Sequence, residues 1–97
     1  MNTQIETEQL ALIRINTDWV TLEIISEPEV YLTSRGYIPV LRVITDGKKV
    51  PRLLSISAKS LAYPLNDMRS DNAGNFTGLK FELRKESTER TALFELR

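Results

Sequence analysis

The chain has 97 residues, 41% of them hydrophobic and 27% charged, and it contains neither cysteine nor histidine. This length predicts one domain that buries roughly 60–65% of its unfolded surface. The missing residue types exclude disulfides, thiolate nucleophiles, cysteine-ligated zinc and histidine general bases. The four glycines are too scattered to form a phosphate-binding loop. We therefore predict a single domain over residues 1–97, with residues 1–8 frayed, that is not an enzyme and carries no metal or cofactor.

No run of the sequence approaches the ~18 consecutive apolar residues of a membrane-spanning helix. Residues 1–4 have neither the basic nor the apolar part of a signal peptide. These two observations predict a cytoplasmic protein with no membrane partner.

The formal net charge of zero hides an uneven distribution along the chain. Residues 1–30 carry one base and six acids (net −5), residues 31–70 carry seven bases and two acids (net +5), and residues 71–97 carry five of each. A basic middle third can give a neutral protein a positive face that attracts phosphate. The alternative is that the acidic and basic thirds pair with each other on folding.

The N-terminal third of the sequence contains two candidate strands. Residues 10–15 form an apolar run that is too short to separate strand from helix, and we expect an additional strand there. From Trp19 to Ile24 apolar and polar residues alternate, as in a half-buried strand. Pro28 ends this strand, and residues 27–36 are predicted to form a loop.

Two apolar-rich runs, residues 37–45 and 48–57, flank Asp46-Gly47, a dipeptide that suits a two-residue type I′ turn. The sequence therefore predicts a hairpin in which Thr45 faces Lys48. Counting back from that pair, Leu41 should face Arg52, and the two strands should bear one mostly apolar face and one mixed face.

After residue 57 the apolar residues fall at helical spacing, which predicts a helix that Ser57 or Ser60 could cap. Pro64 should limit this helix to two or three turns. Residues 79–84 then alternate strongly and predict a strand, and residues 91–96 predict a final strand after a charged hairpin loop.

The resulting order is three strands, a helix and two strands, with a possible strand before them. This order predicts a mostly β fold, an OB-like five-stranded barrel with a short helix between strands three and four and a possible extra N-terminal strand. An SH3-like barrel and a strand-rich α+β sandwich are the alternatives.

The layout also bears a family likeness. The stretch 18–25, the hairpin around Asp46-Gly47, the segment 57–61 and the Thr77-Gly78 step into a strand follow each other in a characteristic order. Over about residues 18–97 the chain resembles small OB-fold single-stranded-DNA-binding proteins of phages and archaeal viruses. The resemblance implies that aromatic and basic side chains on the barrel and its loops hold a nucleic-acid strand.

Binding of single strands requires aromatic faces on which bases stack, worth about 1–3 kcal/mol per base, and cations that follow the phosphates. In an OB-fold the binding face comprises strands two and three and the loops between strands one and two and between four and five. We predict single-stranded DNA as the partner, with RNA possible, and a homo-oligomer, with a dimer favoured. The candidate binding residues are Trp19, Tyr31, Arg35, Tyr37, Arg42, Lys48, Lys49, Arg52, Lys85 and Arg90.

For each of these aromatic residues the alternative role is core packing, and for each base it is a solvated surface position or protection of a strand edge. The second functional hypothesis is accordingly a protein-interaction or assembly barrel that binds no nucleic acid. It would use an exposed strand edge or an apolar patch, such as the mixed hairpin face bearing Ile38, Val40 and Leu53.

Overall fold

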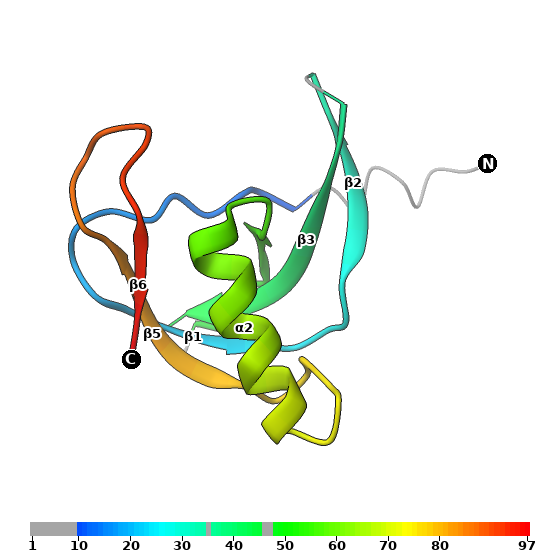
Figure 1. The fold of residues 1–97 in the computed structure, drawn as a ribbon. Helices are drawn as coiled ribbons and strands as arrows, with labels where there is room; N and C mark the ends of the chain where they lie inside the picture. The colour runs from blue at the N-terminus through cyan, green and yellow to red at the C-terminus, as the bar shows by residue number, and fades with distance from the viewer. Residues whose placement is uncertain (1–9, 35, 46–47) are drawn as a thin grey trace.

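The computed structural model describes residues 10–34, 36–45 and 48–97, so the expected fraying of residues 1–8, Arg35 and the expected Asp46-Gly47 turn lie outside the described part. Six strands and one helix are formed within those ranges (Figure 1). The prediction of a mostly β fold is confirmed. The elements are β1 (Val20–Ile24), β2 (Glu29–Thr33), β3 (Gly36–Thr45), β4 (Arg52–Ser55), α2 (Lys59–Asp71), β5 (Lys80–Lys85) and β6 (Phe94–Leu96).

The long strand β3 organises the antiparallel sheet. Val43 pairs with Ile24 of β1 and with Arg52 of β4, so β1 and β4 lie on opposite edges of β3. Val40 pairs in the same way with one residue of β2 and one of β4. The strand β2 therefore lies on the same edge of β3 as β1 and follows β1 along that edge. On the far side of β1 lie β5 and then β6. The strands thus run in the order β4, β3, β1, β5, β6, with β2 extending the line of β1, and the sheet is open because no ladder joins β4 to β6 among the described residues.

The break between β1 and β2 occurs at Pro28, which has no N–H for a ladder. The Ile25 N–H donates to the Arg42 carbonyl (2.9 Å), and the Arg42 N–H then donates to the Ser26 hydroxyl (3.0 Å) instead of a backbone carbonyl. A side chain therefore replaces one backbone acceptor. The sheet continues past the proline as β2, whereas the sequence predicted a loop over residues 27–36, because Pro28 signals an end without showing that pairing resumes.

Glu27, in the same break, anchors the loop that follows the helix. Its carboxylate accepts hydrogen bonds from the Thr77 hydroxyl (2.7 Å), the Thr77 N–H (2.9 Å) and the Phe76 N–H (3.1 Å). The Thr77 hydroxyl, the two N–H groups and the nearby Arg69 cation all favour the charged carboxylate, and they lower the pKa of Glu27 below its ordinary value.

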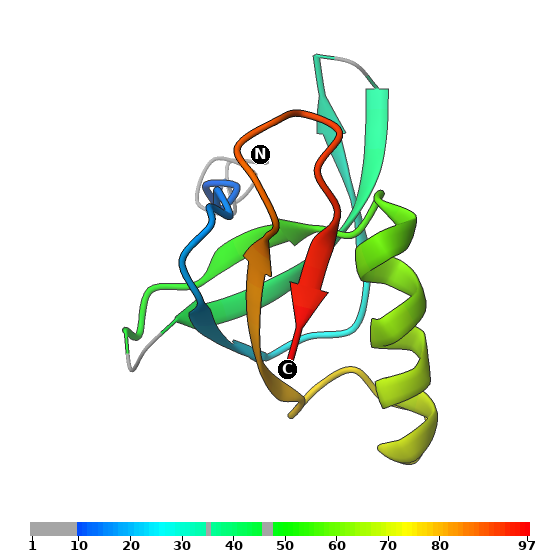
Figure 2. The same cartoon turned by 60° about the vertical axis from the view of Figure 1, so that its left-hand side comes forward.

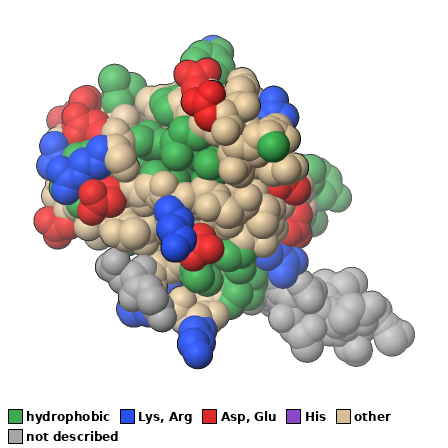
Figure 3. Space-filling view, turned by 90° about the horizontal axis from the view of Figure 1, so that it is seen from below, with side chains coloured by type: hydrophobic (Ala, Val, Ile, Leu, Met, Phe, Trp, Pro, Cys, Tyr) green, Lys and Arg blue, Asp and Glu red, His purple; other side chains and the backbone are tan. Residues whose placement is uncertain are grey.

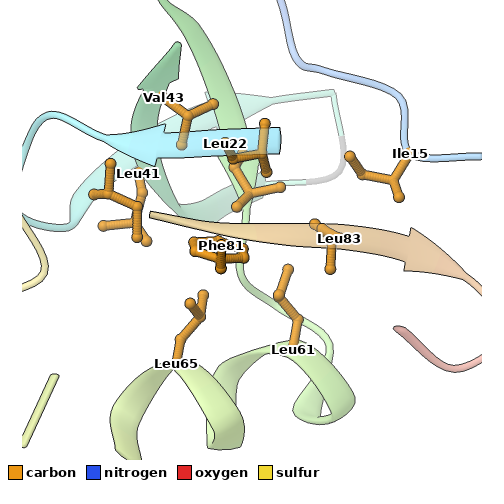
Figure 4. Packing of buried hydrophobic residues seen from close by; sticks show 10 residues of the cluster. Ile15, Leu22, Leu41, Val43, Leu61, Leu65, Phe81 and Leu83 are labelled. Atoms are coloured by element: carbon orange, nitrogen blue, oxygen red, sulfur yellow. The ribbon is translucent and has the colours of Figure 1, made fainter. Parts of the chain in front are cut away.

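The core lies between the sheet and α2. Leu61 and Leu65 of the helix point toward Phe81 and Leu83 of β5, and Leu22 of β1 lies behind them (Figure 4). All five side chains are buried, and burying each one is worth about 1.5–3 kcal/mol. The alternation seen in the sequence of β1 and β5 is therefore the alternation between core and solvent.

The helix α2 is longer than the two to three turns expected, with 13 residues and Pro64 inside it. The proline lacks the N–H of one helical hydrogen bond, and the helix continues because Leu61 and Leu65 pack onto the sheet on either side of it. Neither expected serine caps the helix, whose N-cap is Ala58. The Ser60 hydroxyl instead accepts a hydrogen bond from the Phe94 N–H (3.1 Å) and ties α2 to β6.

The register between β3 and β4 differs from the expected one by two residues. Leu41 faces Leu54, whereas the two-residue turn predicted that it faces Arg52. The connection is longer than that turn, because Pro51 cannot donate to the ladder and β4 starts only at Arg52. A slip of two residues keeps every side chain on its own face. On the mixed face, Val40 and Leu53 are buried and do not form the exposed apolar patch expected there.

The two ends of the chain are less regular than expected. Residues 10–15 form no strand and make an isolated parallel bridge, Leu12 to Leu53. The last strand covers residues 94–96 rather than 91–96.

Candidate nucleic-acid interface

The segment 10–18 crosses the open side of the sheet. The Ile13 N–H donates to the Leu53 carbonyl (2.8 Å) and the Leu53 N–H donates to the Ala11 carbonyl (2.9 Å), which fixes the segment beside β4. Farther along, the Lys85 N–H at the end of β5 donates to the Asn16 carbonyl (2.7 Å). In Figure 2 this dark blue segment lies between the β3–β4 connection on the left and the orange-to-red β5–β6 loop.

Arg14, in the middle of this segment, lines three open hollows of about 360, 250 and 440 Å³. The second hollow also contains Trp19, Lys48 and Arg52. The third is lined by Arg14, Asn16, Lys85 and Arg90 among others. Because neighbouring hollows share residues, they form one continuous surface, which we call the basic groove. It runs from the β3–β4 connection to the β5–β6 loop and is defined by Arg14, Trp19, Lys48, Arg52, Lys85 and Arg90.

The basic groove is strongly positive. Five bases line its hollows, and Asp18 is the one acid among the residues that line them. None of these five bases forms an ion pair with a residue that the structure describes, although Lys85 lies over the Phe94 ring at 5.6 Å. Unpaired cations around a hollow are free to meet phosphates without first breaking a salt bridge.

Trp19, at one wall of the groove, is held by side chains of the neighbouring strands. The Arg84 and Arg97 guanidinium carbons lie 4.5 and 4.1 Å from the centre of its ring. Arg84 is in turn paired with Glu95 (2.7 Å), and Arg97 with Glu82 (2.8 Å). We call these five residues the tryptophan ladder. It explains why the indole, which remains half-buried, has a fixed position beside the groove.

The other candidate residues lie apart from the groove. Tyr31 and Tyr37 are on the β2–β3 hairpin, which projects from the body of the molecule (Figure 1), and the Tyr37 side chain is 72% exposed. Arg42 is bound bidentately by Glu29, at 2.8 and 3.2 Å. Lys49 is exposed in the β3–β4 connection. Arg35 lies outside the described residues.

The structure therefore brings five of the ten candidate residues together and adds Arg14, which the sequence did not single out. Arg14 is the one base within an acidic third, and the ambiguous run around it gave no reason to place it near Lys48 or Lys85. The basic residues around it come from more than thirty positions away in the sequence, so the pattern of the run could not indicate them.

Figure 3 shows a face on which acidic and basic side chains are interspersed around a hydrophobic area. In the part of the chain that the structure describes, no helix combines the length and the apolar composition that crossing a bilayer requires. Comparisons of the chain with protein-family models, with curated proteins and with solved structures find no match.

Proposed function

We propose that the protein binds single-stranded nucleic acid, with DNA preferred over RNA, along the basic groove. The observation that carries the proposal is the position of Arg14, which joins two clusters of unpaired bases into one positive surface. Cations follow the phosphates of a strand, and neutralising each phosphate releases a condensed counterion. A binding role without catalysis also fits the absence of cysteine and histidine from the sequence.

We further propose that the fold is a variant of the OB-fold. If β1 and β2 are counted as one interrupted strand, the sheet has five strands, and α2 lies between the third and the fourth. The five then have the adjacent pairs expected of that fold, with the barrel left open between β4 and β6. The loop between strands four and five would be the β5–β6 loop, which bears Arg90 of the groove.

The test is a titration of a labelled oligonucleotide of about 20 nucleotides, single-stranded or duplex, followed by fluorescence anisotropy at about 50 and 300 mM salt. We expect the single strand to bind more tightly and the affinity to fall as salt rises. A matched RNA strand measures the preference for DNA. If no strand binds at the lower salt concentration, the proposal is wrong.

Two lysines at opposite ends of β5 provide a matched pair of variants. Lys85→Ala removes a cation of the groove, and Lys80→Ala removes an exposed cation away from it. We expect Lys85→Ala to lower the slope of log affinity against log salt by about 0.7 and Lys80→Ala to leave it unchanged. Equal effects of the two variants would mean that net charge, and not the groove, determines binding.

A further inference from the structure

The β2–β3 hairpin has an exposed apolar face. Val30 pairs with Pro39 and Leu32 pairs with Tyr37, so these four side chains share one face of the hairpin. Val30, Leu32 and Tyr37 are 71%, 62% and 72% exposed, and Pro39 is exposed as well. Exposed apolar residues that are adjacent in this way are unusual on a monomer, whereas isolated ones are common.

No described strand pairs with the outer edge of β2. Among the described residues β2 pairs with β3 alone and ends the sheet. Thr33 and Gly36 flank a two-residue connection, so they form a hydrogen-bonded pair, and the alternation of an antiparallel ladder makes Tyr31 and Ile38 the next such pair. The N–H and C=O groups of Val30 and Leu32 therefore point outward. In Figures 1 and 2 the hairpin projects from the body, and no other described strand or helix lies along this edge.

We propose that β2 pairs with β2 of a second copy of this chain, antiparallel and about a two-fold axis at Tyr31. In this register Val30 faces Leu32 of the second copy, and all the outward N–H and C=O groups of the two strands meet a partner. Glu29 faces Thr33 of the second copy, so no two acids oppose each other. The proposal does not depend on the proposed function.

Charge on the edge also favours a second copy. Natural edge strands are commonly protected by lysine or proline, and β2 contains neither. Its one charged residue, Glu29, is already neutralised by Arg42 of its own chain at 2.8 Å. Two such strands can approach without repulsion, and the Val30 and Leu32 side chains of the two copies would then form one continuous apolar row across the joined sheets.

A five-residue strand is smaller than a standard protein interface, so we expect a reversible dimer with a dissociation constant of about 10–100 µM. Sedimentation of the full chain over about 10–500 µM measures it. Leu32→Lys should weaken the dimer by about 30-fold or more, because each edge strand then carries a lysine, a residue that discourages edge-to-edge pairing. Val50→Lys is the control, because Val50 is 73% exposed but lies in the β3–β4 connection. A wild-type chain that stays monomeric throughout this range, or a dimer that survives Leu32→Lys, would overturn the proposal.

The register can be tested by cross-linking, since the chain has no cysteine of its own. Across the proposed axis the two Tyr31 Cα atoms form a non-hydrogen-bonded pair about 4.5 Å apart, within the range of a disulfide. The two Val30 Cα atoms would be about 8 Å apart, which is too far. We expect Tyr31→Cys to form a covalent dimer on mild oxidation and Val30→Cys to remain largely monomeric. Equal cross-linking of the two variants would rule out this register, and circular dichroism confirms that each variant is folded.

Discussion

Two groups of basic side chains meet at Trp19, and they differ in the partners that the fold gives them. In the tryptophan ladder, Arg84 and Arg97 stand on or beside regular strands, and each is paired with a glutamate of the neighbouring strand. In the basic groove, the bases come from loops, strand ends and the crossing segment, and no described acid pairs with them. The difference teaches that the position of a cation relative to a sheet register, more than its type, separates an arginine that is paired with a cross-strand glutamate from a base that has no described acidic partner.

The largest effect should follow from reversing charge in the groove. We expect the double variant Arg14→Glu/Arg52→Glu to lose about 100-fold or more in affinity for a single strand at low salt, because two attractions become repulsions. The double variant Lys59→Glu/Lys80→Glu changes the net charge equally but lies away from the groove, and it should lose only a small part of the affinity. Anisotropy titrations measure both. Equal losses would remove the distinction between the groove and the rest of the surface.

Removing the Trp19 indole should disrupt the tryptophan ladder. Trp19→Ala leaves the Arg84 and Arg97 guanidinium groups without the ring over which they lie at 4.5 and 4.1 Å. Because the side chain is only half-buried, we expect the free energy of unfolding to fall by about 2 kcal/mol, less than for a core tryptophan. Urea denaturation followed by circular dichroism measures the change. A loss under about 0.5 kcal/mol would show that the ladder contributes little to stability.

A smaller effect compares one arginine from each group. Arg84→Ala removes a partly screened ion pair and a cation–π contact, so we expect about 1 kcal/mol of stability to be lost with the affinity changed by less than about threefold. Arg52→Ala should do the opposite and lower the affinity by about five- to tenfold with stability almost unchanged. Thermal melts measure the stability of the two variants, and anisotropy titrations on the same samples measure their affinity. The comparison fails if both variants lose affinity to the same extent.

Glu27 gives the smallest effect, which is confined to acid pH. Because hydrogen bonds from Thr77 and Phe76 lower the pKa of Glu27 in the folded protein, the carboxylate stabilises the fold above its unfolded pKa. This stability is lost as the pH falls through the folded pKa. The melting temperatures of wild type and Glu27→Gln should therefore differ at neutral pH and converge on acidification. A difference that stays constant from about pH 7 to pH 3 would show that the bonds do not depend on the charge.

Much of the fold was predictable because its signals are local. The alternation around Leu22 and Phe81 marks strands with one buried face, and the helical spacing after residue 57 places Leu61 and Leu65 toward the sheet. The strand β2 was missed because Pro28 indicates an ending and nothing in residues 29–33 indicates that pairing with β3 resumes. The turn at Asp46-Gly47 suggested a register that the observed pairing of Leu41 with Leu54 does not follow.

The candidate site was predictable only in part. Composition and charge pointed to Lys48, Arg52, Lys85 and Arg90, and the structure places these four around one groove. Two features of the site could be found only from the three-dimensional structure. One is that Arg14 lies between the two ends of the groove, and the other is that Trp19 is held by arginines from β5 and from the end of the chain. Contacts between residues far apart in sequence leave no periodic signal within any short window.

The pairing of β1 with β5 has a consequence for the order in which the chain can assemble. The hairpins β2–β3 and β3–β4 join near neighbours, whereas Val20 meets Leu83 across 63 intervening steps of sequence. Closing so long a loop costs conformational entropy before the two strands make any stabilising contact. The early hairpins can form while the chain is still incomplete, but one edge of β1 stays unpaired until β5 has been synthesised. The last quarter of the sequence therefore determines when folding finishes.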